Sequence, residues 1–274
     1  MLPAAKAGIA LVVLASTSVG GYYLFNSNTK EVKQTFVLAS KVKTDLDRSY
    51  TTEKFGNVYS IYMVDPNNEK NKWWWEAVYE AFKSDVSGSS EKSKFSTEFQ
   101  NVSAIDQAYS KSSNDTKALN QVCEVAFQKT KTDVSSTTKP NYEDNVWTYC
   151  SILRSHPKVI PDSVDAAYTG KNGETHKGKA VSVSAEDDEA NKSFWDLRNK
   201  EFFDIVSSKS SGNSSKGSIF KSLYGKKSDV RGDEDTVKKA CEGAYGKVSS
   251  ENTEASQEDI KRFCYLVPEI TADS

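Results

Sequence analysis

Amphipathic segments separated by polar loops run through most of the chain, and their apolar positions recur at three- and four-residue spacing, which is typical of helices with one buried face. Asp115 is placed to cap one helix, and Ser256–Asp259 resembles a capping box that opens another. The pattern predicts a mainly α fold. The predicted helices are residues 70–84, 95–105, 115–127, 142–153, 191–206, 219–224, 235–248 and 256–267.

Two short stretches have a different pattern. Residues 57–64 and 178–184 alternate and contain Val, Ile or Tyr, which predicts short strands that could pair with each other. The alternative fold class is therefore α+β. Residues 26–54 form a polar lead-in whose apolar spacing again predicts a helix.

The segments recur in the same order at a nearly constant offset. Cys123 and Cys241 lie 118 positions apart, and Cys150 and Cys264 lie 114 apart. This order predicts two tandem repeats of a small helical-bundle module. The other aligned pairs are Trp75 with Trp195, Gly56 with Gly178 and, one position out of register, Asp144 with Asp259 and Trp147 with Phe263.

The N-terminal segment is apolar, whereas the mean hydropathy of the whole chain is −0.62. Ala7 to Phe25 is a run of 19 uncharged residues, enough for a helix that spans a bilayer. A signal peptide cleaved near Ser16–Gly21 is the alternative. Either reading places the remainder outside the membrane, with Lys6 on the cytoplasmic side. The predicted organisation is an anchor at 1–25, the lead-in at 26–54 and modules at 55–160 and 161–274.

The four cysteines fall as one pair in each repeat, on the apolar faces of predicted helices. Export favours disulfides, so Cys123–Cys150 and Cys241–Cys264 are the predicted bridges. Four buried free thiols are the alternative. The sequence lacks a C-x-x-C motif, and neither histidine is placed beside a cysteine pair, so no metal site is expected.

Three consecutive tryptophans, Trp73, Trp74 and Trp75, span about 200° of a helix and cannot all face one core. One interpretation is an exposed contact patch for a partner or a lipid surface. The favoured interpretation is that two lie in the core and the third packs under a loop.

The composition argues against several functional classes. Charged residues make up 27% of the chain and the net charge is −2, so nucleic acid is not an expected partner. Residues 173–179 match a phosphate-loop pattern but lack the following hydroxyl and the strand–loop–helix setting. His156 and His176 lack a nucleophile and are interpreted as solvated or helix-end residues. Arg231-Gly232-Asp233 is a short receptor-binding tripeptide that also arises by chance. No catalytic residue and no cofactor is expected.

The apolar N-terminus, Trp74-Trp75-Glu76, Ala118–Glu124 and Trp147–Ser151 together resemble large paralogous families of uncharacterised proteins in haemotropic mycoplasmas. The resemblance implies a wall-less bacterium and an ectodomain facing host fluid, with no assigned activity. We therefore expect a membrane-anchored surface antigen or host-interaction protein. The alternatives are a small-molecule or peptide-binding module with a cleft between the repeats and, less favoured, an exported hydrolase.

Overall fold

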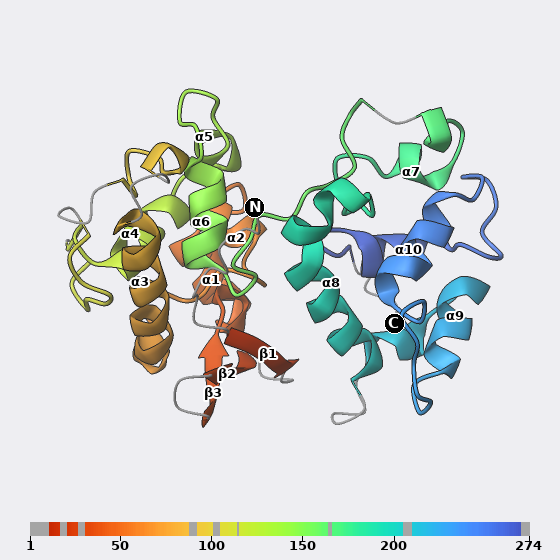
Figure 1. Cartoon of the computed structure of the whole chain (residues 1–274), viewed down its shortest axis with the longest axis horizontal. Helices are drawn as coiled ribbons and strands as arrows, with labels where there is room; N and C mark the ends of the chain where they lie inside the picture. Colours follow the sequence, from red (N-terminus) through yellow and green to blue (C-terminus); the bar gives the residue numbers. More distant parts are fainter. Residues whose placement is uncertain are drawn as a thin grey trace, which may run out of the picture. The chain divides into compact units, whose positions relative to one another are not determined.

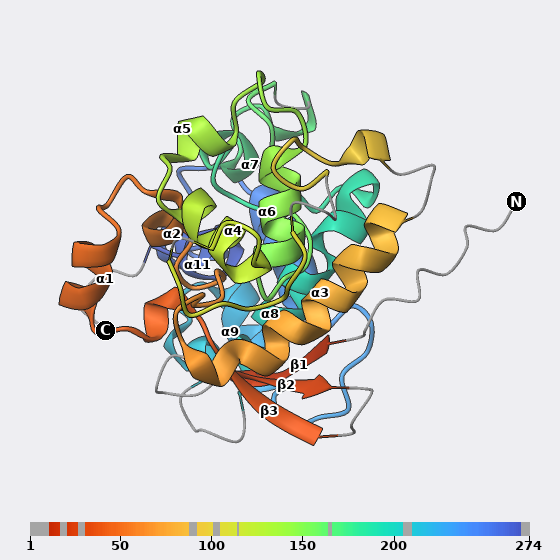
Figure 2. The same ribbon diagram turned by 90° about the vertical axis from the view of Figure 1, so that its left-hand side faces the viewer.

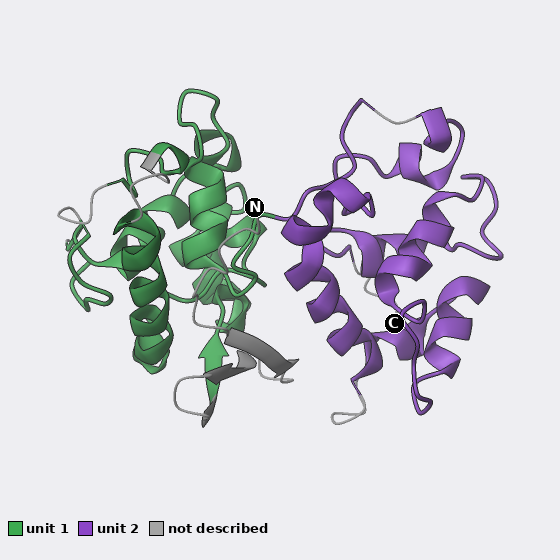
Figure 3. Ribbon diagram, in the orientation of Figure 1, with its two compact units in different colours: residues 1–156 green, residues 157–274 purple. Residues whose placement is uncertain are grey.

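The computed structural model describes residues 11–16, 21–26, 31–87, 92–100, 105–113, 115–163, 166–204 and 210–269. The chain divides into two compact units, residues 1–156 and residues 157–274 (Figure 3). Helices dominate both units, as the hydrophobic pattern predicts (Figure 1). Each unit is described by itself below.

Unit 1 combines a small sheet with six helices among its described residues (Figure 1). The long helix α3 passes beside β3, where the Trp73 indole donates a hydrogen bond of 3.4 Å to the Gln34 carbonyl (Figure 2). The elements are β1 (Leu11–Ser16), β2 (Gly21–Asn26), β3 (Glu31–Phe36), α1 (Lys43–Ser49), α2 (Phe55–Val58), α3 (Lys72–Ser87), α4 (Leu119–Phe127), α5 (Lys131–Val134) and α6 (Tyr142–Cys150).

The three strands form an antiparallel sheet in the order β1-β2-β3, with Gly21 opposite Phe36 and Asn26 opposite Glu31. Two stretches of the segment predicted as a membrane helix are therefore strands, and its other residues lie outside the described part of the chain. Among the described helices, none combines the length and apolar character needed to cross a bilayer. Membrane attachment stays a prediction.

The predicted lead-in helix is replaced by β3, a short 3₁₀ turn and α1. Val37, Leu38, Leu46 and Tyr50 from this stretch are at most 4% exposed. The apolar spacing in the lead-in thus marks core residues of unit 1 on a bent chain rather than one continuous helix.

The predicted strand over residues 57–64 is wrong. Phe55–Val58 is helical, a turn follows, and only Met63 and Val64 are extended, in single bridges to Ser151 and Val37. The predicted strand over 178–184 is wrong for the same reason. Helix α7 (Asn172–Thr175) and a turn precede it, and the chain forms only isolated bridges there, from Val181 to Val159 and from Ala180 to Tyr265. In both stretches the apolar residues are buried on a short helix and the turn after it, and only the last residues are extended, in single bridges.

Helix α4 begins three residues later than its predicted cap requires. Asp115 instead accepts hydrogen bonds from the Lys117 amide and the Gln107 side chain. The backbone of Gln107 takes the capping role instead: its carbonyl accepts a hydrogen bond of 2.9 Å from the amide of Leu119, the first residue of α4. Residues 95–100, part of the helix predicted over 95–105, form turns.

Unit 2 begins at Pro157 and is wholly helical in its described elements (Figure 1). Ser256 makes no side-chain cap, so the predicted capping box does not form. The elements are α7 (Asn172–Thr175), α8 (Asp188–Phe203), α9 (Ser218–Gly225), α10 (Val237–Tyr245) and α11 (Gln257–Asp259), which continues as a π-helical turn (Ile260–Cys264).

A set of backbone hydrogen bonds ties residues 55–64 of unit 1 to its last helix and to the segment that follows α4. The Val64 amide donates to the Cys150 carbonyl at 3.0 Å, and the Phe55 amide donates to the Lys129 carbonyl at 2.8 Å. Buried Asn71 completes the set, because its side chain both donates to and accepts from the backbone of Phe36.

The corresponding bonds occur in unit 2. The Val181 amide donates to the Cys264 carbonyl at 2.9 Å, and the Asn172 amide donates to the Lys247 carbonyl at 2.9 Å. Buried Asn191 exchanges the same pair of bonds with the backbone of its own partner, Lys158.

These contacts correct two of the sequence alignments. Gly56, one residue after Phe55, corresponds to Gly173, one residue after Asn172, rather than to Gly178. Asp259 corresponds to Asn145 rather than to Asp144: the Asn145 side-chain oxygen accepts the Ser96 amide at 2.8 Å, and the Asp259 carboxylate accepts the Gly217 amide at 2.6 Å.

By the same offset Phe263 corresponds to Tyr149 rather than to Trp147. Both rings pack against the phenylalanine at the end of the long helix, Tyr149 on Phe82 at 5.3 Å and Phe263 on Phe202 at 5.0 Å between ring centroids. Trp147 of unit 1 therefore corresponds in position to Lys261 of unit 2. A buried aromatic ring in one unit thus stands where the other unit has a lysine.

Candidate functional site

Both predicted disulfides are present, one within each unit. Cys123 of α4 is bonded to Cys150 of α6 with the Cα atoms 5.7 Å apart, and Cys241 is bonded to Cys264 with the Cα atoms 5.9 Å apart. All four residues are fully buried, and the chain has no free cysteine. Each bridge joins α4 or α10 to the last helix of its unit, where the two helices already pack.

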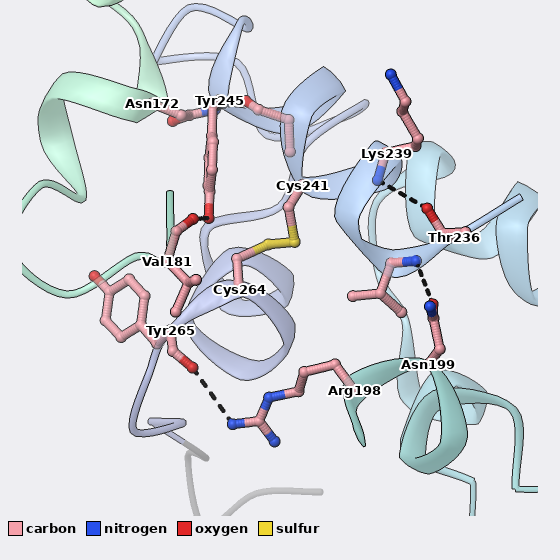
Figure 4. The surroundings of a disulfide bond; sticks show 12 residues. Asn172, Val181, Arg198, Asn199, Thr236, Lys239, Cys241, Tyr245, Cys264 and Tyr265 are labelled. Carbon is pink, nitrogen blue, oxygen red and sulfur yellow. Dashed lines mark hydrogen bonds between the residues drawn. A yellow bond between two sulfur atoms is a disulfide. The ribbon is translucent and has the colours of Figure 1, made fainter. Parts of the chain in front are cut away.

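The bridge of unit 2 lies in a set of buried polar contacts (Figure 4). The Tyr245 hydroxyl, from the same helix as Cys241, donates to the Val181 carbonyl at 2.9 Å. The Arg198 guanidinium, from α8, reaches the Tyr265 carbonyl at 3.4 Å. Burial raises the pKa of Tyr245 well above its usual range, so this hydroxyl stays protonated as a donor.

The tryptophan triplet does not form a contact patch of three exposed rings. Trp74 and Trp75 are fully buried and pack edge to face at 4.7 Å between ring centroids. Trp73 is half-buried, with the Lys33 ammonium 5.9 Å from the centre of its ring. Two rings therefore belong to the core, as the favoured interpretation has it, and only Trp73 reaches the surface.

A groove lies on unit 2 between α9 and α10. Its volume is about 470 Å³. Ile219 and Leu223 of α9 face Ala240 and Gly243 of α10 across its apolar floor. A Cβ atom added at Gly243 would still stand 4.0 Å from the Ile219 side chain, so the glycine widens this end of the groove.

The rim of the groove is charged. Lys226 is paired with Asp235, and Lys239 is paired with Glu242 at 2.9 Å and with Glu234 at 3.8 Å. The Lys226 hydrogen bond lowers the pKa of the Asp235 carboxyl, and the Glu242 hydrogen bond raises the pKa of Lys239. Three carboxylates against two ammonium groups leave the rim with an excess negative charge at neutral pH.

The Arg231-Gly232-Asp233 tripeptide lies in the exposed loop that joins α9 to α10. The Arg231 guanidinium is 4.1 Å from the centre of the Phe203 ring and donates to the Lys227 carbonyl at 3.1 Å. The arginine is thus held back against its own unit. A receptor that binds this tripeptide would have to displace the Phe203 contact first.

The two histidines have unlike environments. His156 of unit 1 stacks on the Trp147 ring and contacts the Asp144 carboxylate at 2.6 Å, close to the predicted helix-end setting. His176 also stands at a helix end, as the C-cap of α7, but it is 2% exposed and therefore not solvated. Its two ring nitrogens lie 2.7 Å from the Tyr265 hydroxyl and 2.6 Å from the Gln257 side-chain oxygen.

The His176 contacts extend to a fourth residue. The Gln257 amide nitrogen donates to the Asn172 side-chain oxygen at 2.6 Å, and the Asn172 amide nitrogen donates to the Ala244 carbonyl at 3.0 Å. We call Asn172, His176, Gln257 and Tyr265 the histidine network. Sequence reasoning missed it; the only signal was an Asn and a His four positions apart, which places both on one helix face.

The phosphate-loop match over residues 173–179 has no phosphate-binding geometry. Gly173 lies inside the one-turn helix α7, and its added Cβ would stand 2.5 Å from the Tyr168 ring. The Gly178 amide is occupied by the Ile160 carbonyl at 2.8 Å. The backbone donors that would hold a phosphate are therefore used within the fold.

Within the described ranges, no group of three or more His, Cys, Asp and Glu side chains is arranged to hold a metal ion. Comparison of the chain with protein-family models, with curated protein sequences and with solved structures finds no match.

Proposed function

We propose that the chain is a surface protein that contacts a host, held to the membrane by its apolar N-terminal segment, with two disulfide-stabilised units outside. The observation that carries the proposal is the pairing of all four cysteines in two buried bridges, one per unit. Structural disulfides persist in oxidising compartments and are rare in reducing ones. The resemblance to haemotropic mycoplasma protein families adds the host-facing setting, and the proposal assigns no catalytic activity.

We also infer that the two units descend from one duplicated module. The inference is supported by the shared framework: a disulfide from α4 or α10 to the last helix of its unit, a buried asparagine at the start of the long helix, and matching backbone bonds to the last helix and to the segment after α4 or α10. Duplication lets one copy keep a framework while the surface of the other changes.

The surface location is tested on intact cells that produce the full chain. External protease should remove the units, and the unreduced, denatured protein should contain no free thiol. A cytoplasmic protein in the same cells provides the control, since it must survive the protease. Protection of the chain from protease, or titration of free thiols, would count against the proposal.

Host contact is tested with the purified full chain on host cells, in competition with an unlabelled excess of the same protein. We expect saturable binding that the excess abolishes. The Cys123→Ser/Cys150→Ser and Cys241→Ser/Cys264→Ser variants then identify which unit carries the contact. Binding that neither saturates nor competes would refute host recognition while leaving the location intact.

A second candidate function is peptide binding, favoured by the groove between α9 and α10. Its apolar floor and its excess of rim carboxylates suit a peptide with one aliphatic and one basic side chain. Short peptides of that composition should raise the melting temperature of the full chain. Gly243→Leu, which fills the groove, should abolish the shift, whereas Gly225→Leu, which lies outside the groove lining, should preserve it. Equal shifts in the two variants would exclude the groove.

A further inference from the structure

The starting point is a histidine enclosed by unit 2. His176 directly follows α7 and is 2% exposed. Tyr265 approaches one ring nitrogen from the C-terminal segment, and Gln257 approaches the other from α11. One imidazole therefore joins α7 to two parts of the chain more than 80 positions away.

The partners of Gln257 determine which ring nitrogen carries the proton. The Gln257 amide nitrogen is used by Asn172, so its oxygen faces His176 Nε2 and must accept. Nε2 then carries the hydrogen, and Nδ1 accepts from the Tyr265 hydroxyl. In this neutral tautomer both His176 nitrogens, the Tyr265 hydroxyl and the Gln257 amide all have partners.

A second proton disturbs this arrangement. It enters at Nδ1, where the Tyr265 hydroxyl hydrogen already points, so the hydroxyl must rotate away and lose its role as donor. Burial is the main reason why the pKa of His176 lies below its usual value of 6.5. The charged form has no carboxylate within the network to compensate it.

The surrounding charges also oppose protonation. Lys179 follows His176 on its own turn, and Lys261 lies on the π-helical turn; both lower the pKa of the imidazole, and Glu269 on the C-terminal segment raises it. Glu269 is shared between the two lysines, at 2.8 Å and 3.7 Å. The loop before α11 carries Lys247 paired with Glu254, which is neutral as a pair.

We propose that His176 is an acid-sensitive latch: its protonation releases α7 from α11 and the C-terminal segment, while the disulfide keeps the rest of unit 2 folded. The contacts that open with it hold α7 to the end of α10. They are the Asn172 amide bond to the Lys247 carbonyl at 2.9 Å, the Asn172 side-chain bond to the Ala244 carbonyl and the bridge between Lys171 and Val248.

The Cys241–Cys264 bond limits how far the opening spreads. It joins α10 to the π-helical turn and involves no residue of α7, so the two elements stay linked when α7 is released. Acid therefore exposes the inner face of α7 and the loop that follows α10 without unfolding the whole unit. A protein facing host fluid would change this surface on entering an acidic compartment.

The direction with pH follows from proton linkage. The unfolded or opened segment binds a proton near pH 6.5, and the closed form binds it only at lower pH. The full latch is present above about pH 6.5 and is lost as the pH falls below it. The opening equilibrium constant should rise by up to about tenfold per pH unit until the closed form is itself protonated.

The first measurement is an NMR titration of the two histidines in the full chain, which contains only His156 and His176. We expect one resonance to titrate below 6.5 with the line broadening of an opening step, and His156→Gln identifies it as His176. If His176 in the folded chain titrates at or above 6.5, the latch is excluded.

The second measurement is amide exchange between pH 7.5 and pH 5.5, expressed as protection factors so that the intrinsic pH dependence cancels. Amides of residues 172–180 should lose protection as the pH falls in the wild type. His156→Gln should behave like the wild type. His176→Gln should have lower protection that no longer varies with pH; if its protection falls with pH as steeply as in the wild type, another group is responsible and the proposal is overturned.

Discussion

At one corner of unit 1 the space beneath the last helix is filled by aromatic rings, and at the corresponding corner of unit 2 it is filled by polar side chains. In unit 1 the Trp147 ring lies 6.1 Å from Phe55, 4.9 Å from Tyr59 and 5.7 Å from Tyr62 between centroids. We call these four residues the aromatic cluster. By the offsets that align the backbone bonds, Phe55, Tyr59, Tyr62 and Trp147 correspond to Asn172, His176, Lys179 and Lys261.

The comparison shows that the backbone framework does not depend on how this corner is filled. Apolar rings stabilise unit 1 by removing area from water, and the histidine of this unit, His156, stacks on the Trp147 ring instead of being enclosed as His176 is. The histidine network stabilises unit 2 through oriented hydrogen bonds, which hold only while every partner keeps its protonation state. The corner of unit 1 is thus held by the packing of rings, and the proposed latch depends on the polar filling of the corner in unit 2.

The largest difference in the free energy of unfolding is expected between substitutions of Trp147 and of its counterpart, Lys261. Trp147→Ala removes a fully buried ring and should lower the free energy of unfolding of unit 1 by about 3–5 kcal/mol. Lys261→Ala removes a side chain that is 41% exposed and should change that of unit 2 by less than about 0.5 kcal/mol. Denaturant unfolding followed by unit-specific amide exchange measures both. Similar losses would mean that the two corners are filled alike.

The disulfides come next. Removing Cys123–Cys150 or Cys241–Cys264 by paired serine substitutions should lower the free energy of unfolding of its own unit by about 3–4 kcal/mol, because the closed loops of 27 and 23 residues differ little. The loss should stay within the unit that carries the substitution. A loss of protection that spreads equally over both units would show that they unfold as one.

A smaller difference is expected between the paired glycines. A Cβ at Gly56 would stand 2.8 Å from the Phe127 Cβ, an atom fixed to its helix, so Gly56→Ala should lower the free energy of unfolding of unit 1 by about 1–3 kcal/mol. Gly173→Ala meets the Tyr168 ring, which is only half-buried and can turn away, so less than about 1 kcal/mol is expected. A larger loss of stability from Gly173→Ala than from Gly56→Ala would contradict this, because it would mean that Tyr168 gives way less than Phe127.

The smallest effect concerns the side chain near the end of each unit that accepts a backbone amide from a distant loop. It is Asn145 in unit 1, which accepts the Ser96 amide, and Asp259 in unit 2, which accepts the Gly217 amide. Burial raises the pKa of the Asp259 carboxyl above 3.8, so its contribution to stability is present at low pH and is lost as the pH rises through the raised value. Asp259→Asn should copy unit 1 and flatten this dependence as the pH rises above 3.8, with a smaller change in the free energy of unfolding than the substitutions above. An unaltered pH profile would contradict the assignment.

Much of this was predictable from short-range patterns. The long helices α3 and α8, the cysteine-bearing helices α4 and α10 and the pairing of the cysteines follow from apolar spacing and from the recurrence of Cys and Trp. Trp73, Trp74 and Trp75 could be divided into core and surface only in part, because helical geometry shows that three adjacent rings diverge but not which neighbour covers each one.

The predictions that failed depend on contacts distant in sequence. Residues 57–64 alternate like a strand, but in the described part of the chain only Met63 and Val64 pair with other segments, so the stretch is a helix end and a turn that lead into two single bridges. Asp115 has the chemistry of a cap, but the Gln107 carbonyl takes that role. His176 looked solvated because its partners, Gln257 and Tyr265, lie more than 80 positions away.

The order of the chain alone determined the mainly helical character, the two-part division and the two sulfur pairs, since helical periodicity and cysteine spacing are local properties. Only the folded arrangement decided which residues correspond between the units and where the histidine is enclosed. Hydrogen bonds and burial join residues by distance in space, and insertions that shift the numbering leave those contacts unchanged.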